Sequence, residues 1–246
     1  MTRKLLTTRK LLTIIIPVRS EEETIGGTIE LVEKTVHTPH IIMIADDTID
    51  PSDRTIEIVE AMKQPTPVSI SIKKKYDRDG FGPALARAIQ KATTPYSVFV
   101  MADLCDDLHA IDRMVSEATE NHLDMVVGCR YMRGGRKIGG PVLQGILSTL
   151  VNAFLFRVAG VSTRDATNAF KLYRTAFLQR ILPVKPESGV EFSLQLTICA
   201  VSRNARMTDI PTTWRGRKKG HSKVRLFSLG PEYMKLIFHV LMNRFA

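Results

Sequence analysis

The strongest chemical signal in the sequence is a group of three aspartates, Asp103, Asp106 and Asp107, directly after an apolar run. Magnesium and manganese prefer hard oxygen ligands, usually one or two carboxylates together with the phosphates of a substrate. We therefore predict a divalent metal, Mg2+ or Mn2+, at Asp103 and Asp106, with Asp103 as the better placed ligand. Helix capping is an equally good explanation for Asp106 and Asp107, which precede the helix expected from Leu108.

A second acidic loop holds Asp46, Asp47 and Asp50 within five residues. Carboxylates accept hydrogen bonds from ribose hydroxyls and from the N–H groups of a nucleobase. Turn formation explains about one of the three aspartates. The loop is therefore a candidate nucleoside contact. Gly80 and Gly82 are a weaker candidate for phosphate approach, because an isolated Gly-x-Gly pair has little specificity.

Basic loops elsewhere in the chain complement these carboxylates. One is rich in glycine, and the other covers residues 215–223. Guanidinium groups on such loops bind phosphate, although solvation alone is the alternative explanation. Together with the acidic loops, they suggest that a divalent cation and a polyphosphate share one cleft. The glycine-rich loop contains Arg130, Arg133, Arg136 and Lys137.

These side chains need a scaffold that brings the loops together. Short apolar runs alternate with amphipathic stretches in the first half of the chain, which is the pattern of βαβ units with a largely parallel sheet. In such sheets ligands bind beyond the carboxyl ends of the strands, where the polar loops would lie. The predicted strands are 12–18, 41–45, 68–72, 97–102 and 125–129, and the predicted helices are 22–36, 53–63, 83–91 and 108–121.

The whole chain, residues 1–246, is predicted to form a single α/β domain. Its 246 residues suffice for one large core, and no linker divides them. A hydrophobic content of 44% with 24% charged residues is typical of a globular protein. Three cysteines without metal-site spacing, and the lack of a recognisable signal peptide, favour a cytoplasmic location.

The net charge of +10 predicts an anionic partner, which is nucleic acid, an acidic membrane surface or a phosphorylated substrate. A nucleic-acid-binding protein should carry basic residues with interleaved aromatics. This chain instead places acidic clusters in its loops, and these repel phosphates unless a metal intervenes. We therefore expect no nucleic-acid partner.

Two amphipathic segments, 143–158 and 229–245, bear on membrane contact. Both could lie in the interface of a bilayer on its cytoplasmic face, and packing in the protein core is the alternative. For segment 143–158 the two interpretations are equally good. Residues 226–246 are predicted to be an amphipathic helical segment with charged groups in it, and neither segment is a convincing membrane span. Peripheral contact with the bilayer and contact with a membrane-protein partner are both left open.

The order of these motifs resembles that of family 2 glycosyltransferases with the GT-A fold. Within that family the chain is most similar to polyprenol-phosphate sugar synthases of the dolichol-phosphate mannosyltransferase type. The likeness runs from about residue 13 to about residue 223, and the order is more specific than any single motif. The resemblance implies a GT-A fold, which is an α/β fold with a mostly parallel central sheet flanked by helices.

On the donor side, the resemblance assigns residues to the nucleotide-sugar and its metal. Asp46 matches the second aspartate of the family's paired-aspartate loop, and Ala45 replaces the first. Asp103 matches the second aspartate of the Asp-x-Asp metal motif, with Met101 in the first position and Cys105 where glutamine is usual. The set assigned to the nucleotide-sugar is Pro17, Arg19, Glu21, Asp46, Gly80, Gly82, Ala102 and Asp103.

On the acceptor side, Arg130 matches a Gly-x-Arg-Tyr loop whose arginine addresses phosphate. Arg217 begins an Arg-x-x-Gly-x-Ser-Lys segment that closes over the donor and acceptor phosphates. Asp165 matches an acceptor-side motif and either takes the proton of a hydroxyl acceptor or orients the acceptor, with a purely structural role as the alternative. The acceptor and phosphate set is Arg130, Arg133, Arg217, Ser222 and Lys223, and the catalytic set is Asp103, Asp165, Arg130 and Arg217.

The resemblance implies an inverting transfer of a sugar from a GDP- or UDP-linked donor. The metal and basic side chains then stabilise the departing nucleoside diphosphate. The expected acceptor is polyprenyl (dolichyl) phosphate. The alternatives are a saccharide hydroxyl acceptor, a nucleotidyltransferase of similar fold, and a metal-poor non-catalytic relative that only binds the nucleotide-sugar.

Overall fold

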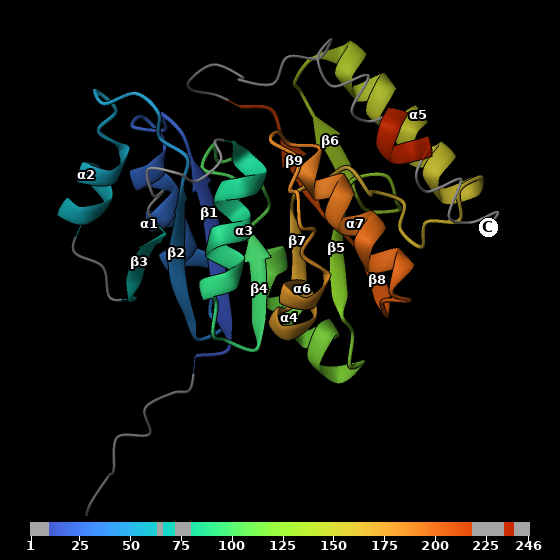
Figure 1. The fold of residues 1–246 in the computed structure, drawn as a ribbon, viewed down its shortest axis with the longest axis horizontal. Coiled ribbons are helices and arrows are strands. Elements are labelled where there is room, and N and C mark those ends of the chain that lie inside the picture. The colour runs from blue at the N-terminus through green and yellow to red at the C-terminus, as the bar shows by residue number, and fades with distance from the viewer. Residues whose placement is uncertain (1–9, 63–65, 72–79, 218–233, 239–246) are drawn as a thin grey trace, which may run out of the picture.

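The computed structural model describes residues 10–62, 66–71, 80–217 and 234–238. Within them, seven strands form one sheet in the order β3-β2-β1-β4-β7-β5-β8 (Figure 1). Neighbouring strands of this sheet are parallel, except that β7 runs antiparallel to β4 and β5. The strands of the described parts are β1 (Leu12–Val18), β2 (His40–Asp46), β3 (Val68–Ser71), β4 (Tyr96–Phe99), β5 (Met125–Cys129), β6 (Arg136–Ile138), β7 (Lys171–Arg174), β8 (Met207–Pro211) and β9 (Thr213–Arg215).

Helices cover both faces of this sheet (Figure 1). Ile14 and Ile16 of β1 join the apolar core that contains α1 and α4, while Ile15 joins the core that contains α3 and α7. Side chains alternate between the faces of a strand, so a strand buried on both faces has a continuous apolar sequence. The helices are α1 (Ile25–Thr35), α2 (Thr55–Ala61), α3 (Phe81–Lys91), α4 (Ala110–Glu120), α5 (Val142–Arg157), α6 (Thr175–Ile181) and α7 (Phe192–Ser202).

The predicted α/β fold with a mostly parallel central sheet flanked by helices is confirmed. β1 and β5 have the predicted bounds, whereas several other ends differ. β4 is shorter than predicted: Val100 N still donates to Ile15 O at 3.0 Å, but the chain then turns into the loop of Asp103. α1 begins later than predicted, because Thr24 N donates to Glu21 O at 3.0 Å and closes a turn first.

A second sheet consists of the parallel strands β6 and β9. Gly139 and Gly140 connect β6 to α5, and both have a φ of 74°, which favours glycine. A side chain at Gly140 would also collide with the ring of Trp214 in β9. The two glycines therefore allow the chain to turn from β6 into α5 against this small sheet.

α5 lies outside the two helix layers, at the edge of the molecule (Figure 1). Of its residues, Asn152 and Leu155 are buried. Leu155 packs with Leu194 of α7 and with Leu236 and Ile237. Core packing, one of the two interpretations of residues 143–158, is therefore wrong for most of that segment, because most of its apolar side chains are exposed.

The predicted amphipathic segment at residues 226–246 is described only at 234–238, which is helical. Its remaining residues, and those of segment 229–245 outside 234–238, lie outside the described part of the chain. In the parts that the structure describes, no helix combines the length and the apolar character needed to cross a bilayer.

Candidate active site

Three side chains from distant parts of the chain meet where β1 and β4 end. Arg217 donates through Nη2 to Glu21 Oε1 at 3.4 Å and to Asp103 Oδ2 at 3.3 Å. All three side chains are largely buried. Glu21 follows β1 and Asp103 follows β4, so both carboxylates stand beyond the carboxyl ends of parallel strands, where ligands bind in such sheets. The structure thus joins two residues predicted to bind the donor with an arginine predicted to bind phosphate.

Hydrogen bonds to its own backbone hold the loop of Asp103. Asp103 Oδ1 accepts from Cys105 N at 3.2 Å, and Asp106 Oδ2 accepts from Met101 N at 2.9 Å. Burial and the neighbouring Asp103 carboxylate raise the pKa of Asp106 to about 7. A nearby cation would favour the charged form of Asp106.

The capping role considered for Asp106 and Asp107 is wrong. α4 begins at Ala110, and no side chain caps it. Asp107 contributes its backbone oxygen, which accepts from Ala110 N at 3.0 Å. The carboxylate of Asp106 binds the backbone of Met101 instead.

The two carboxylates suit a metal that is shared with a substrate. Among the described residues, no three His, Cys, Asp or Glu side chains cluster as a complete metal site. Asp103 and Asp106 lie close enough to interact electrostatically, and Arg217 already places a positive group against Asp103 Oδ2. Mg2+ takes one or two carboxylates and completes its shell with phosphates and water. The residues therefore fit a divalent ion that arrives with a nucleoside diphosphate.

The second acidic loop is more structural than predicted. Asp46 Oδ1 accepts from Thr48 N at 2.9 Å, and Asp50 Oδ1 accepts from Ser52 N at 2.9 Å. Asp47 also accepts from a backbone N–H group. Backbone bonding therefore involves all three aspartates, whereas turn formation was expected to explain only one. Asp46 remains at the carboxyl end of β2, as a nucleoside contact requires.

Asp47 has a positioning role that sequence reasoning missed. Its buried carboxylate pairs with Arg19 and accepts from Gly80 N at 2.7 Å. Asp47 thereby ties together the loops after β1 and β2 and the start of α3. The sequence around Asp47 does not indicate this role, because its partners Arg19 and Gly80 lie 28 and 33 residues away.

Chain packing by itself requires glycine at positions 80 and 82. A side chain at Gly80 would collide with the backbone oxygen of Ser188, and one at Gly82 with the backbone oxygen of Glu187. Gly80 also has a φ of 125°. The close neighbour that requires these glycines is therefore the segment before α7, and phosphate approach at the Gly-x-Gly pair stays a prediction.

Two other residues predicted to bind the donor, Pro17 and Ala102, are held within the body of the protein next to these loops. Pro17 is buried in β1 beside Ala45 of β2, and the backbone oxygen of Ala102 accepts from Thr28 Oγ1 at 3.0 Å. Arg133, predicted to bind phosphate, is exposed. Ser222 and Lys223 lie outside the described residues.

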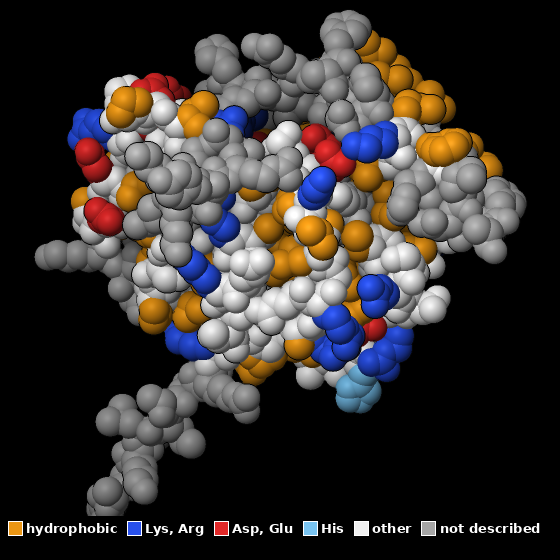
Figure 2. Space-filling model, in the orientation of Figure 1, with side chains coloured by type: hydrophobic (Ala, Val, Ile, Leu, Met, Phe, Trp, Pro, Cys, Tyr) orange, Lys and Arg blue, Asp and Glu red, His pale blue; other side chains and the backbone are white. Residues whose placement is uncertain are grey.

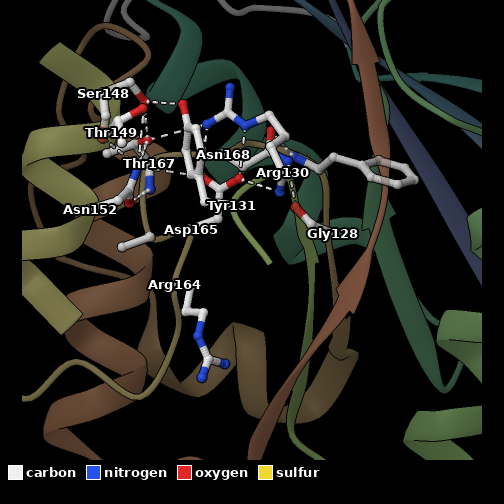
Figure 3. A network of polar contacts seen from close by, with 12 residues as sticks. Gly128, Arg130, Tyr131, Ser148, Thr149, Asn152, Arg164, Asp165, Thr167 and Asn168 are labelled. Atoms are coloured by element: carbon white, nitrogen blue, oxygen red, sulfur yellow. Dashed lines mark hydrogen bonds and ion pairs between the residues drawn. The ribbon is translucent and has the colours of Figure 1, made fainter. Parts of the chain in front are cut away.

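Arg130 and Asp165 form a buried ion pair at the end of β5 (Figure 3). Arg130 donates to Asp165 from its backbone N at 2.9 Å, from Nε at 2.8 Å and from Nη2 at 2.7 Å. Burial alone would lower the pKa of Arg130, but the hydrogen bonds and charge of Asp165 raise it. Asp165 is fully buried with both oxygens engaged, so it cannot take a proton from an acceptor in this geometry. The base interpretation does not fit, whereas an orienting role does.

An open cleft of about 480 Å³ runs from Arg217 toward the start of α5. Lys137 lies beside it, with Nζ 5.1 Å from the centre of the Trp214 ring. Burial and the charge of Arg130 lower the pKa of Lys137. The positive groups around the cleft make it suitable for an anionic ligand. The cleft is lined by Ile138, Gly139, Gly140, Arg215, Gly216 and Arg217.

Sequence reasoning also missed the polar side chains around the Arg130–Asp165 pair. Ser148 and Asn152 of α5 reach this pair through Thr167, and Tyr131 donates to Ser148 (Figure 3). One signal was available: Ser148 and Asn152 are polar, stand four residues apart in an apolar helix, and so share one face.

Together, the parallel sheet, the carboxylates beyond its strands and the basic cleft define a GT-A-like α/β fold. A solved structure of glucosyl-3-phosphoglycerate synthase from Mycobacterium tuberculosis, in complex with Mn2+, uridine diphosphate and glucosyl-3-phosphoglycerate, has the same fold. It matches with a TM-score of 0.67 at 17% identity, over 96% of this chain and 80% of that one. The family model "Glycosyl transferase family 2" matches residues 13–182, so the chain belongs to glycosyl transferase family 2.

Two curated relatives are similar along most of the chain. Polyprenol monophosphomannose synthase of Mycolicibacterium smegmatis is 26% identical over 215 residues, which cover 86% of this chain and 80% of the relative. Dolichol-phosphate mannosyltransferase of Pyrococcus furiosus is 23% identical over 229 residues, which cover 93% of this chain but only 63% of the relative. The chain is a family 2 glycosyltransferase, and its relationship to these two proteins is distant.

Proposed function

We propose that the chain catalyses the inverting transfer of a sugar from a GDP- or UDP-linked donor to the phosphate of a polyprenyl lipid. The observation that carries this proposal is the meeting of Arg217 with Glu21 and Asp103 beside a basic cleft that leads to an apolar helix. Both relatives described above are named for mannose and for polyprenol or dolichol phosphate, which supports the lipid acceptor.

On the donor side, Asp103 and Asp106 would hold the Mg2+ or Mn2+ ion, which neutralises the charge of the nucleoside diphosphate. Asp46 accepts from the nucleoside. Arg217 exchanges these two carboxylate contacts, which Nη2 makes at 3.4 and 3.3 Å, for phosphate oxygens, with which a guanidinium can form two parallel hydrogen bonds. Glu21 and Asp103 hold this arginine close to the donor before the exchange.

The reaction forms one bond and breaks one. A phosphate oxygen of the acceptor attacks the anomeric carbon, while the bond from that carbon to the nucleoside diphosphate breaks and its electron pair leaves with the diphosphate. The attacking oxygen is already anionic, so no general base is required. This agrees with the burial of Asp165 against Arg130. Arg130 and Arg217 stabilise the acceptor phosphate and the departing diphosphate respectively.

The outward face of α5 offers a surface for the lipid. Val142, Ile146 and Leu150 follow each other at helical spacing and are 77%, 52% and 61% exposed. Figure 2 shows this apolar surface at the upper right, over α5. Apolar helix faces beside basic groups bind anionic membrane surfaces. We propose that α5 rests on the cytoplasmic face of a membrane, so that the lipid phosphate enters the cleft. Contact with a membrane-protein partner is the alternative.

An extraction assay tests the proposed function. Purified protein is incubated with Mn2+ and radiolabelled GDP- and UDP-sugars, with and without polyprenyl phosphate in liposomes. We expect label in the organic phase only when the lipid is present. Label transferred only to a water-soluble saccharide would contradict the lipid acceptor. Binding of the nucleotide-sugar without transfer or hydrolysis would identify a non-catalytic relative.

A further inference from the structure

Asn152 is a buried polar residue on a helix whose surface is mainly apolar and exposed. Its side chain is 1% exposed, and it shares the inner face of α5 with Leu155. Leu155 packs in an apolar cluster, whereas Asn152 faces the loop that carries Asp165. α5 is therefore anchored to the protein by one apolar and one polar contact region.

The orientation of the Asn152 amide is fixed by its partners. Thr167 N donates to Asn152 Oδ1 at 3.2 Å, so the oxygen must face the loop. Asn152 Nδ2 donates to Thr167 Oγ1 at 2.8 Å and to Ser148 O at 2.9 Å. Nδ2 also lies 3.5 Å from Asp165 Oδ1. Both ends of the amide are thus committed to this one region.

Thr167 Oγ1 is the atom at which α5 and the ion pair meet (Figure 3). It lies 3.4 Å from Arg130 Nη2, 2.8 Å from Asn152 Nδ2 and 3.1 Å from Ser148 Oγ. Ser148 Oγ in turn accepts from Tyr131 OH at 3.0 Å. The guanidinium of Arg130 is therefore linked to α5 on one side and to Asp165 on the other.

Other contacts tie the same loop to the body of the protein and not to α5. Asn168 Nδ2 donates to Gly128 O at 2.7 Å, Lys171 Nζ donates to Ala166 O at 2.7 Å, and Thr163 Oγ1 donates to Asp209 Oδ1 at 2.5 Å. These bonds hold the loop if Asn152 is removed. The loss of Asn152 should therefore weaken the link between α5 and the ion pair, which Ser148 keeps in part, without unfolding the loop.

We propose that Asn152 is a positioning residue that couples α5 to the Arg130–Asp165 pair and so sets the orientation of Arg130 toward the acceptor. Its effect on transfer rests on the proposed function, but the coupling itself does not. α5 is then a part of the acceptor site as well as an apolar surface, because the helix and the phosphate-binding arginine share hydrogen bonds.

The test compares Asn152→Ala with Thr149→Ala, a matched control on the same helix. Thr149 is exposed and donates only to Gly145 O within α5, at 2.9 Å. For Asn152→Ala we expect the KM for polyprenyl phosphate to rise about tenfold, the size of effect that one net hydrogen bond supports. Nucleoside diphosphate binding should change less than about twofold, and Thr149→Ala should match the wild type.

A second readout does not depend on the acceptor. The Arg130 Nε–H signal in a 15N spectrum, assigned by its loss in Arg130→Lys, should exchange slowly with water because its acceptor is a buried carboxylate. In Asn152→Ala we expect this exchange to become about tenfold faster. Thr167→Val, which removes the shared Oγ1 but keeps the side-chain shape, should reproduce the change if Asn152→Ala folds poorly.

The outcomes separate this inference from the proposed function. Unchanged Arg130 Nε–H exchange in both Asn152→Ala and Thr167→Val would overturn the coupling. An unchanged KM for the lipid, in a wild type that does transfer sugar to it, would overturn the positioning role. Faster exchange in a protein whose wild type never labels the lipid would instead support the coupling and contradict the proposed acceptor.

Discussion

The proposed site has a donor half, around Asp103, and an acceptor half, around Arg130, and the two halves hold their charged groups in opposite ways. In the donor half, Glu21 and Asp103 are carboxylates whose shared partner, Arg217, comes from a different part of the chain. In the acceptor half, Arg130 is fixed by Asp165 in a buried ion pair. In the donor half two carboxylates share one arginine, which leaves negative charge that suits a cation arriving with the substrate, whereas in the acceptor half one carboxylate is paired with one arginine. Removing a charge should therefore lower mainly the transfer rate in the donor half and mainly the free energy of unfolding in the acceptor half.

The largest expected effect is at Asp103. Asp103→Asn keeps the shape of the side chain but removes the charge that holds the metal, so we expect the transfer rate to fall about a thousandfold. Initial rates with Mn2+ and the labelled donor measure it. Asp107→Asn is the matched control and should stay within about threefold of the wild type, because it removes a neighbouring charge outside the proposed metal set. Both variants should unfold at nearly the wild-type urea concentration, and a large loss of stability in Asp103→Asn would break the comparison.

At Arg130, in contrast to Asp103, we expect a large loss of stability. Arg130→Met leaves the carboxylate of Asp165 buried without its partner, and we expect the free energy of unfolding to fall by about 3–5 kcal/mol. Urea denaturation measures this loss. The double variant Arg130→Met/Asp165→Leu should recover most of the stability and still fail to transfer sugar. A double variant no more stable than Arg130→Met would contradict the account.

The buried lysine behind the acceptor half gives a pH-dependent test. Burial lowers the pKa of Lys171 to about 7, and Nζ donates to Ala166 O and to Ser193 O and Oγ. Between this value and the normal pKa of a lysine, the unfolded chain binds a proton that the folded chain does not. Stability should therefore rise with pH, by roughly 2 kcal/mol between about pH 7 and about pH 9.

Urea denaturation of the wild type and of Lys171→Met at several pH values checks this sign. The variant should lack the rise contributed by Lys171. If wild type and variant gain the same stability over this range, Lys171 is charged in the folded protein and the prediction is wrong.

The smallest expected effect concerns the apolar face of α5. Leu150 is exposed, so Leu150→Glu should leave stability unchanged, but we expect binding to anionic liposomes to weaken about tenfold. Co-sedimentation with liposomes measures this. Leu31→Glu, the same change at an exposed leucine of α1, is the control. Equal weakening by both substitutions would show that α5 has no special role in membrane contact.

The first half of the fold could be predicted from sequence because its information is local. β1 and β5 are apolar runs bounded by polar loops, and their predicted bounds agree with the structure. The pairing of β6 with β9 could not be predicted in this way, because the two strands are short and come from distant parts of the chain. Arg136 of β6, for example, pairs with Thr213 of β9. A strand of three residues is too short to show the alternation of apolar and polar residues that identifies a strand in a sequence.

The site was predictable at the level of residue types and less so at the level of partners. Glu21, Asp103 and Arg217 were each proposed from motifs, and the structure places them in contact although 114 residues separate the last two. The roles of Asp47 and of Gly82 were not visible, because a neighbour from a distant segment determines each of them. For Asp165 the motif left the roles of base and of acceptor orientation both open, because burial cannot be read from a motif.

The most direct test of the central claim is whether the donor half binds a nucleoside diphosphate through a metal at Asp103. Trp214 is the only tryptophan of the chain and lies in β9, next to Arg215 in the cleft wall, so its fluorescence can report binding. We predict that UDP or GDP changes this fluorescence in the wild type only when Mn2+ is present, and that Asp103→Asn abolishes the response. Binding of equal affinity without Mn2+, or in Asp103→Asn, would contradict the claim.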